Sequence, residues 1–245
     1  MDLRQIIAAG ETGWSPGSLN PLAWWYASTN YANVTGSGTV SQWSDRSGNG
    51  NTVAQTTVSL QPTWDTTSWG GRPVLTTNSL ESLSLTSGSV LSRMNGDDIA
   101  FSVFATFRID TIGSNVLTAW DHTTGAATSV CRCDNPGSNV LRYDREDDAS
   151  ASASVSSPGL FATGAHTRAS YSFSGTVMSF FLNGNAAGLG SANVGTQTFN
   201  RFRLFDGPGA SDSFDGALAE LVVLARTHSA AEAAAYYAYS LTEWA

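Results

Sequence analysis

The stretch DDIAFSVFATFRID, Asp97–Asp110, decides the fold class. Apolar side chains recur at every second position from Ile99 to Ile109, and polar side chains such as Ser102 and Thr106 lie between them. Successive side chains of a strand point to opposite faces, so this alternation predicts a half-buried β-strand. One face of the strand is expected to pack on a core and the other to meet solvent.

Further strands are predicted on both sides of this one along the chain. The segment GALAELVVLAR, Gly216–Arg226, is apolar on both faces, which is typical of a central strand covered on both sides. TVMSFFLNGN, Thr176–Asn185, and FNRFRLFDG, Phe199–Gly207, also alternate. The dipeptide Asn183-Gly184 is a strong hairpin-turn signal. The chain is therefore predicted to be mostly β.

One helix is predicted, over HSAAEAAAYYAYSLTEW, His228–Trp244. Ser229 stands as N-cap with Glu232 three residues later, which is the capping-box pattern. The residues that follow are strong helix formers. An apolar stripe at i, i+4 and i+7 is expected to pack on the domain, and it consists of Tyr237, Leu241 and Trp244.

The composition favours one acidic domain. Charged residues are 13% of the 245, the formal net charge is −8, and all twelve basic residues are arginine. The totals supply no basic face for nucleic acid. Residues 1–20 carry no periodicity and are predicted to be an arm, followed by a single domain over 21–245. The N-terminal apolar run is too short for a signal peptide, and no stretch is long enough to insert in a membrane.

The stretch QWSDRSGNGN, Gln42–Asn51, poses three alternatives: a phosphate loop, a metal loop or a structural turn. A phosphate loop requires a helix to follow, but the next segment is rich in Thr and Val. The acidic pattern of an EF-hand is absent. We expect a turn, pinned by an Asp45–Arg46 pair.

The segment DREDDASASASVSSPG, Asp144–Gly159, is acidic and serine-rich. Its low complexity predicts an exposed loop.

Several pieces, taken in order, resemble the concanavalin A-like lectin/glucanase superfamily in its laminin-G-like form, which is common in bacterial and phage proteins. They cover about residues 18–245. The pieces are LAWWYAS, VSQWSDRSGNGN, QPTW with GGRPVL, IAFSVFATFR, MSFFLNGN and FDGALAELVVLARTHSAAEAAAYYAYSLTEW. The resemblance implies an all-β fold: a single β-sandwich (jelly roll) of two antiparallel sheets with a short C-terminal helix.

The function that this resemblance implies is adhesion without catalysis. The run WSPGSLNPLAWWYAS, Trp14–Ser28, also looks like the one that precedes such domains in phage-encoded proteins. We therefore expect a module on a virion or other extracellular surface that binds host glycans and attaches to other virion proteins through its arm. The alternative is a structural decoration protein that binds only virion subunits.

A glycoside hydrolase is the least favoured interpretation. Such an enzyme needs two carboxyl groups flanking the scissile bond. In the laminarinase-like branch of the superfamily they lie on one strand as Glu-x-Asp-x-x-Glu, and this motif does not occur here. We therefore expect no enzymatic activity.

The expected glycan site combines an aromatic face with planar polar groups that pair with hydroxyls. Two segments offer them, TAWDHTTG and LRYDRED. The candidate carbohydrate-binding residues are Trp120, Asp121, His122, Arg142, Tyr143 and Asp144. On a regular strand Arg142 and Asp144 would share a face and Tyr143 would oppose them, which leaves Trp120 as the stacking surface. A core position for Trp120 is the alternative.

Calcium is the cofactor that the resemblance implies, because laminin-G-like domains often bind it at the rim. Carboxylate oxygens suit this hard cation. The segment FDGPGASDSFDG supplies three candidate ligands, Asp206, Asp212 and Asp215. An acidic turn without a metal is the alternative.

Overall fold

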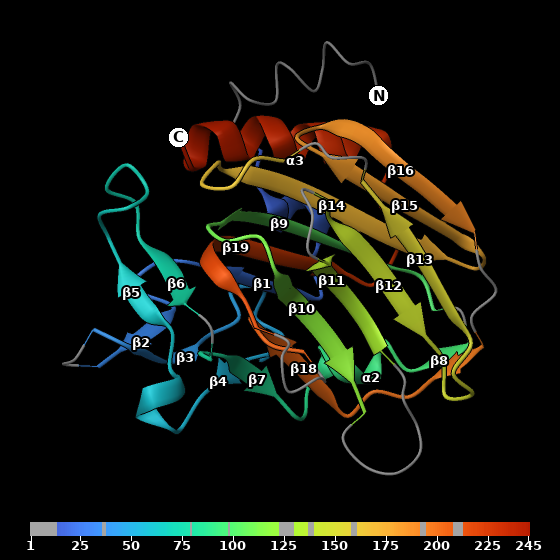
Figure 1. Cartoon of the computed structure of the whole chain (residues 1–245), viewed down its shortest axis with the longest axis horizontal. Helices are drawn as coiled ribbons and strands as arrows, with labels where there is room; N and C mark the ends of the chain where they lie inside the picture. The colour runs from blue at the N-terminus through green and yellow to red at the C-terminus, as the bar shows by residue number, and fades with distance from the viewer. Residues whose placement is uncertain are drawn as a thin grey trace.

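The computed structural model describes residues 14–35, 38–78, 80–97, 99–122, 130–136, 140–157, 161–191, 195–207 and 213–245. Within these ranges the chain forms two large antiparallel sheets that face each other, with one long helix across the outside of the first sheet (Figure 1). This arrangement confirms the predicted all-β sandwich with a short C-terminal helix.

The first sheet is antiparallel and contains the predicted central strand. Among the described residues its order is β16 (Asn185–Ser191), β15 (Val177–Leu182), β14 (Thr167–Ser174), β9 (Phe101–Ile109), β19 (Asp215–Leu224), β6 (Val74–Asn78) and β5 (Thr63–Asp65). β1 (Ala23–Tyr26) pairs with the second half of β19. β19 therefore lies between β9 on one side and β6 and β1 on the other.

The second sheet is also antiparallel. Its order in the described residues is β13 (Ser152–Ser156), β12 (Arg142–Glu146), β11 (Val130–Pro136), β10 (Ser114–Asp121), β18 (Arg201–Leu204), β7 (Leu83–Leu85), β4 (Val53–Ala54), β3 (Val40–Trp43) and β2 (Ala32–Val34). Five described elements are smaller: the paired strands β8 (Gly96–Asp97) and β17 (Thr196–Gln197), the helix α2 (Ser89–Ser92), and two 3₁₀ turns at Pro16–Leu19 and Val58–Leu60. The C-terminal helix is α3 (Ala230–Glu243).

Aromatic side chains join the two sheets across the core. Trp25 of β1 stacks on Phe202 of β18 with ring centroids 5.2 Å apart. Tyr143 of β12 stacks on Tyr171 of β14 at 4.6 Å, and the Tyr171 hydroxyl lies 2.7 Å from the hydroxyl of Thr118. Such pairs add to the apolar area that each ring buries. The core between the sheets is therefore largely aromatic.

Strand β9 was predicted to be half-buried, and the structure corrects this. Its alternate residues enter the core as expected, but Ser102 and Thr106 on the other face are also buried. The reason is α3 and the segment that precedes it, which cover that face: the Thr106 hydroxyl lies 2.9 Å from the Tyr236 hydroxyl of α3, and Ser102 Oγ donates to the carbonyl of Arg226 at 2.7 Å. Hydrogen bonds satisfy these polar groups under the helix.

The helix begins as predicted but buries a different stripe. The Ser229 hydroxyl accepts from the Glu232 N–H, and the Glu232 side chain accepts from the Ser229 N–H, so the capping box is confirmed. Of the predicted stripe only Trp244 is buried. Leu241 is 43% exposed. The buried stripe consists of Ala233, Tyr236, Ser240 and Trp244. No helix of the described residues is both long and apolar enough to cross a membrane.

The QWSDRSGNGN stretch forms a turn, but not through the predicted Asp45–Arg46 pair. The Asp45 carboxylate accepts from the backbone N–H groups of Trp24, Ser47 and Asn51. Arg46 instead places its guanidinium 4.1 Å from the ring centroid of Trp24. The turn therefore links β1 to the loop after β3, with Asp45 as the acceptor at its centre.

The predicted loop Asp144–Gly159 is wrong over two stretches that form strands. Residues up to Glu146 belong to β12, and Ser152–Ser156 form β13, which pairs with it. The small residues alternate, with Val155 buried and the neighbouring serines exposed. Asp147 closes the turn by accepting from the N–H groups of Ala149 and Ala151. A period of two outweighed low complexity here.

The N-terminal arm is described only from residue 14, so most of the predicted arm lies outside the described residues. Pro16–Leu19 form a 3₁₀ turn. The Trp14 ring packs edge-on against Tyr239 of α3, with centroids 5.7 Å apart. This part of the arm lies on the helix.

A buried carboxylate lies between α3 and the first sheet. Glu220 of β19 is fully buried and accepts three hydrogen bonds from aromatic side chains. The donors are Trp24 Nε1 at 2.6 Å, Tyr239 Oη at 3.2 Å and Trp244 Nε1 at 3.2 Å. Burial raises the pKa of Glu220 to about 7, against the lowering effect of these donors, and the charge of Glu243 raises it further. Tyr236, also fully buried, faces the same carboxylate.

Glu220→Gln is expected to change how stability depends on pH. In the unfolded chain Glu220 ionises near its ordinary value of 4.5, so the folded state binds the extra proton between pH 4.5 and about 7. The contribution of Glu220 is therefore fully present below pH 4.5 and is lost as pH rises through 7. The gap in pKa corresponds to about 3 kcal/mol. Relative to the parent chain, Glu220→Gln should have a free energy of unfolding about 3 kcal/mol higher at pH 8 than at pH 4.5. Denaturant unfolding of both chains at the two pH values measures this difference.

The difference between the two chains isolates Glu220 from His228, which acts in the opposite direction. Burial lowers the pKa of His228 to about 4, so its contribution is lost as pH falls below its ordinary value of 6.5. The parent chain and Glu220→Gln both contain His228, so its contribution to stability cancels in their difference. If the two chains differ equally at pH 4.5 and pH 8, the folded state does not hold a proton on Glu220.

Candidate functional site

The outer side of the second sheet carries arginine and aspartate side chains from four strands. On these strands Trp120, Cys133, Tyr143 and Phe202 point into the core, so the residues beside them point outward. We call the outward set the arginine–aspartate face. It consists of Asp121 (β10), Arg132 and Asp134 (β11), Arg142 and Asp144 (β12), and Arg201 and Arg203 (β18). The strands β10, β11 and β12 lie side by side in Figure 1.

Asp121 is the centre of the first ion-pair cluster on this face. Arg201 binds it with two hydrogen bonds, Nε to Oδ1 at 2.9 Å and Nη2 to Oδ2 at 3.2 Å. Arg203 Nη2 lies 2.8 Å from the same carboxylate, and Arg203 Nη1 lies 2.6 Å from Asp206. Burial raises the pKa of Asp121, and the charge and hydrogen bond of Arg203 oppose that shift. Asp121 is 1% exposed, so the carboxylate that binds both guanidiniums lies beneath the surface of the face.

Asp134 is the centre of the second cluster. Arg142 binds it through Nε at 3.0 Å and Nη2 at 2.6 Å. Arg132 lies 3.1 Å from Asp134 and 3.3 Å from Asp144, and thus links β11 to β12. Burial raises the pKa of Asp144, and the charges of Arg142 and Arg132 oppose the shift. The two clusters lie on neighbouring strands, because Ala119 of β10 opposes both Arg132 and Arg203.

The structure brings three of the six predicted carbohydrate-binding residues together and directs two others away. Asp121, Arg142 and Asp144 lie on the arginine–aspartate face, and Arg142 and Asp144 share it as expected from the period of the strand. Trp120 and Tyr143 are fully buried in the core. Trp120 packs against Phe101 and Phe202, so it offers no surface for a sugar ring. The alternative of a core tryptophan fits its position.

The sixth predicted residue, His122, follows the last residue of β10 and is half-buried. Its Nδ1 is buried and has no hydrogen-bond partner among the described residues. Residues 123–129, which follow it, lie outside the described residues.

The predicted calcium ligands do not form a complete set in the described residues. Asp206 binds Arg203 and accepts from the N–H of Gly207 at 2.9 Å. Asp215 lines a separate cleft, and Asp212 lies outside the described residues. No group of three or more Asp, Glu, His or Cys side chains in the described part of the chain is arranged around a cation position. The calcium site stays a prediction.

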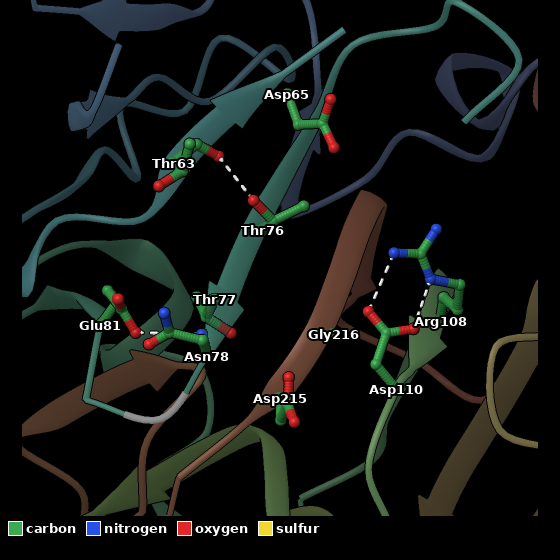
Figure 2. A pocket seen from close by; sticks show the side chains of 10 residues that line it. All are labelled: Thr63, Asp65, Thr76, Thr77, Asn78, Glu81, Arg108, Asp110, Asp215 and Gly216. Atoms are coloured by element: carbon green, nitrogen blue, oxygen red, sulfur yellow. Dashed lines mark hydrogen bonds and ion pairs between the residues drawn. The ribbon is translucent and has the colours of Figure 1, made fainter. Parts of the chain in front are cut away.

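A polar cleft of about 310 Å³ opens on the first sheet, where β5 and β6 meet the start of β19 and the end of β9 (Figure 2). Its lining residues are Thr63, Asp65, Thr76, Thr77, Asn78, Glu81, Arg108, Asp110, Asp215 and Gly216. Arg108 binds Asp110 through Nε at 2.6 Å and Nη2 at 2.9 Å, as the dashed lines in Figure 2 show.

The sequence did not predict most residues of the arginine–aspartate face or of the cleft. On the face it missed Arg132, Asp134, Arg201 and Arg203, although VCRCD and NRFRLFD alternate charged and apolar residues and could have indicated them. Of the cleft it named only Asp215. The other lining residues come from four separate segments with no shared pattern.

No protein-family model matches this chain, and no curated protein sequence is similar to it. Solved structures do share its fold.

Three solved structures illustrate this likeness. The binding domain of botulinum neurotoxin serotype G superposes with a TM-score of 0.67 at 10% identity over 89% of this chain, which spans only 50% of that one. Domain 4 of AbnA, a GH43 extracellular arabinanase from Geobacillus stearothermophilus in complex with arabinotriose, gives 0.59 at 12% identity over 89% of this chain and 98% of that one. CBM40 of the Ruminococcus gnavus IT-sialidase bound to α2,3-sialyllactose gives 0.56 at 10% identity, over 66% and 95%.

Proposed function

We propose that this chain is a non-enzymatic glycan-binding module whose ligand rests on the arginine–aspartate face. The observation that carries the proposal is the fixed arrangement of guanidinium and carboxylate groups on this face. Asp121 and Asp134 each bind two guanidiniums within 3.2 Å. Guanidinium and carboxylate groups bond in pairs, which suits neighbouring hydroxyls on a sugar. The ion pairs set these groups before a ligand arrives, so little side-chain entropy is lost on binding.

Two further observations support the proposal. Arg142 and Arg201 expose 27% and 28% of their side chains, so both lie partly at the surface. Two proteins of the same fold were solved with glycans, sialyllactose and arabinotriose. The non-enzymatic part of the proposal rests on the sequence, which lacks the paired carboxylate motif of the laminarinase-like enzymes.

Replacing Arg142 is expected to weaken glycan binding while the fold stays intact. Arg142→Ala should cost about 1–3 kcal/mol if this side chain is an anchor. Arg142→Lys should not restore binding, because an ammonium group keeps the charge but loses the paired geometry. A glycan array would identify the ligand and calorimetry would measure it, with α2,3-sialyllactose and arabinotriose as the first probes.

A matched control is Arg226→Ala. Arg226 is exposed and pairs with Glu232 at the start of α3, on the first sheet. Its replacement should leave glycan binding unchanged. Unchanged binding in both Arg142→Ala and Arg201→Ala would remove this face from the site. An array with no bound glycan would favour the structural alternative, in which the sandwich contacts only other proteins.

The setting belongs to the proposal as well. We place the module on a phage virion or other extracellular surface, attached through residues 1–20. The support is the resemblance of the run at Trp14–Ser28 to those that precede such domains in phage-encoded proteins. Capsid or tail genes beside the coding sequence would support this setting, and a neighbourhood of unrelated metabolic genes would oppose it.

A further inference from the structure

The cleft in the first sheet is built from segments that bond to one another. Arg108 donates to both oxygens of Asp110 and to the carbonyl of Ser68 at 3.2 Å. Glu81 accepts from the N–H groups of Asn78 and Leu80. These contacts hold the rim of the cleft in place. The hydrogen-bonding capacity used in these contacts is not available to a ligand.

Other groups in the cleft remain uncommitted. The Asp215 N–H donates to Asn115 Oδ1, but the Asp215 carboxylate makes no hydrogen bond or ion pair with any residue that the structure describes. The side-chain amide of Asn78 and the hydroxyl of Thr63 likewise bond to no described residue. Figure 2 shows Asp215, Asn78 and Thr63 around the same space. One acceptor and two groups that both donate and accept are thus available.

A further acceptor comes from Asp65. Its Oδ1 accepts from the N–H and hydroxyl of Thr67 and from the N–H of Ser68. Burial alone would raise the pKa of Asp65, but these hydrogen bonds outweigh it and lower the pKa to about 2. The carboxylate is therefore ionised at any working pH.

One lining residue, Gly216, lies where β19 comes close to the backbone of β9. Gly216 has φ near +159°, and a Cβ there would lie 2.0 Å from the carbonyl oxygen of Arg108. Only glycine permits this approach of β19 to β9. The close approach of β19 to β9 beside Asp215 therefore depends on Gly216.

We propose that this cleft is a second ligand site, which takes one neutral sugar residue. Its volume of about 310 Å³ is at the small end of ligand sites, as expected for a single ring. The uncommitted carboxylate, amide and hydroxyl match a ligand with several hydroxyl groups. Four acids and one arginine line the cleft, so an anionic sugar is excluded by like charge. The site lies on the other sheet from the arginine–aspartate face and does not depend on it.

The test uses the full chain and a panel of neutral methyl glycosides of hexoses, pentoses and deoxyhexoses, followed by saturation-transfer NMR. At least one neutral glycoside should bind in the cleft, and any binding of methyl glucuronoside should be unaffected by Asp215→Asn. Asp215→Asn should weaken the binding of the neutral glycoside roughly 10- to 100-fold, the usual range for losing a hydrogen bond to a charged group. Since the Asp215 carboxylate makes no hydrogen bond or ion pair within the described part of the chain, the melting temperature should not change.

Two variants and a metal control keep the result decisive. Thr63→Val, an exposed change on β5, should also weaken the binding, and Arg142→Ala should leave it unchanged. If Arg142→Ala abolishes binding while Asp215→Asn retains it, the sugar rests on the arginine–aspartate face, so the cleft proposal fails and the proposed function stands. Binding of no neutral glycoside, or glucuronoside binding that Asp215→Asn changes and Arg142→Ala does not, would overturn the cleft proposal. A melting temperature raised by calcium alone, and lost in Asp215→Asn, would identify a cation site and also overturn it.

Discussion

A chain that ends at Ser229, and so lacks α3, is expected not to fold cooperatively. Tyr236 and Trp244 are 2% and 0% exposed, and removing large buried side chains typically costs about 3–5 kcal/mol each. Their loss would also uncover Phe104 and Val222 of the first sheet. The sum is comparable with the whole stability of a domain, about 5–15 kcal/mol.

The buried carboxylate makes this truncation worse than the loss of apolar area alone. Glu220 would lose its donors Tyr239 and Trp244. The end of the helix is also tied down, because Trp69 Nε1 and Arg168 Nη2 donate to the carbonyl of Trp244 at 3.2 and 3.1 Å. Buried polar groups without partners add their own cost.

Thermal and denaturant unfolding, followed by circular dichroism, would measure the effect. Ser229→Ala in the full chain is the control, since it removes only the cap and should cost about 1 kcal/mol. A truncated chain with the melting temperature of the full chain would contradict the packing of α3 described above.

Trp120→Ala is expected to destabilise the sandwich by about 3–5 kcal/mol. The Trp120 ring is fully buried, and its centroid lies 4.6 Å from that of Phe202 and 5.9 Å from that of Phe101. The change would leave a cavity between the sheets.

Trp120→Phe separates packing from polar effects. The indole Nε1 meets no acceptor among the described residues, so phenylalanine loses no hydrogen bond and should cost less than the alanine variant. Guanidinium chloride unfolding of both variants measures the two costs. If Trp120→Ala retained full stability and lost only glycan binding, the ring would belong to a binding surface and not to the core.

Local patterns account for what could be read from the sequence. The alternation in β9, the apolar run of β19, the Asn183-Gly184 turn and the capping box at Ser229 are each contained in a few consecutive residues. Each depends on backbone period or on hydrogen bonds between near neighbours, which the sequence specifies directly. The resemblance added the order of these pieces and hence the sandwich.

The errors occurred where a residue's surroundings come from a distant segment. Leu241 and Tyr236 both lie on an apolar helix with tyrosines on several sides, and contacts with Phe104 and Thr106 of β9 decide that Tyr236 is the buried one. Trp120 is polar at one edge and apolar elsewhere, so its residue type suits a core as well as a sugar site.

By itself the sequence determined a mostly β chain with a capped C-terminal helix, because strand period and helix caps are local, and the resemblance supplied the sandwich. Only the tertiary structure decided where the charged groups meet. Arg201 reaches Asp121 across 80 residues of chain, and the cleft joins β5, β6, β9 and β19. Antiparallel pairing places such segments 4.7–4.9 Å apart in a register that each segment alone does not specify. A binding surface built across strands is therefore a property of that register.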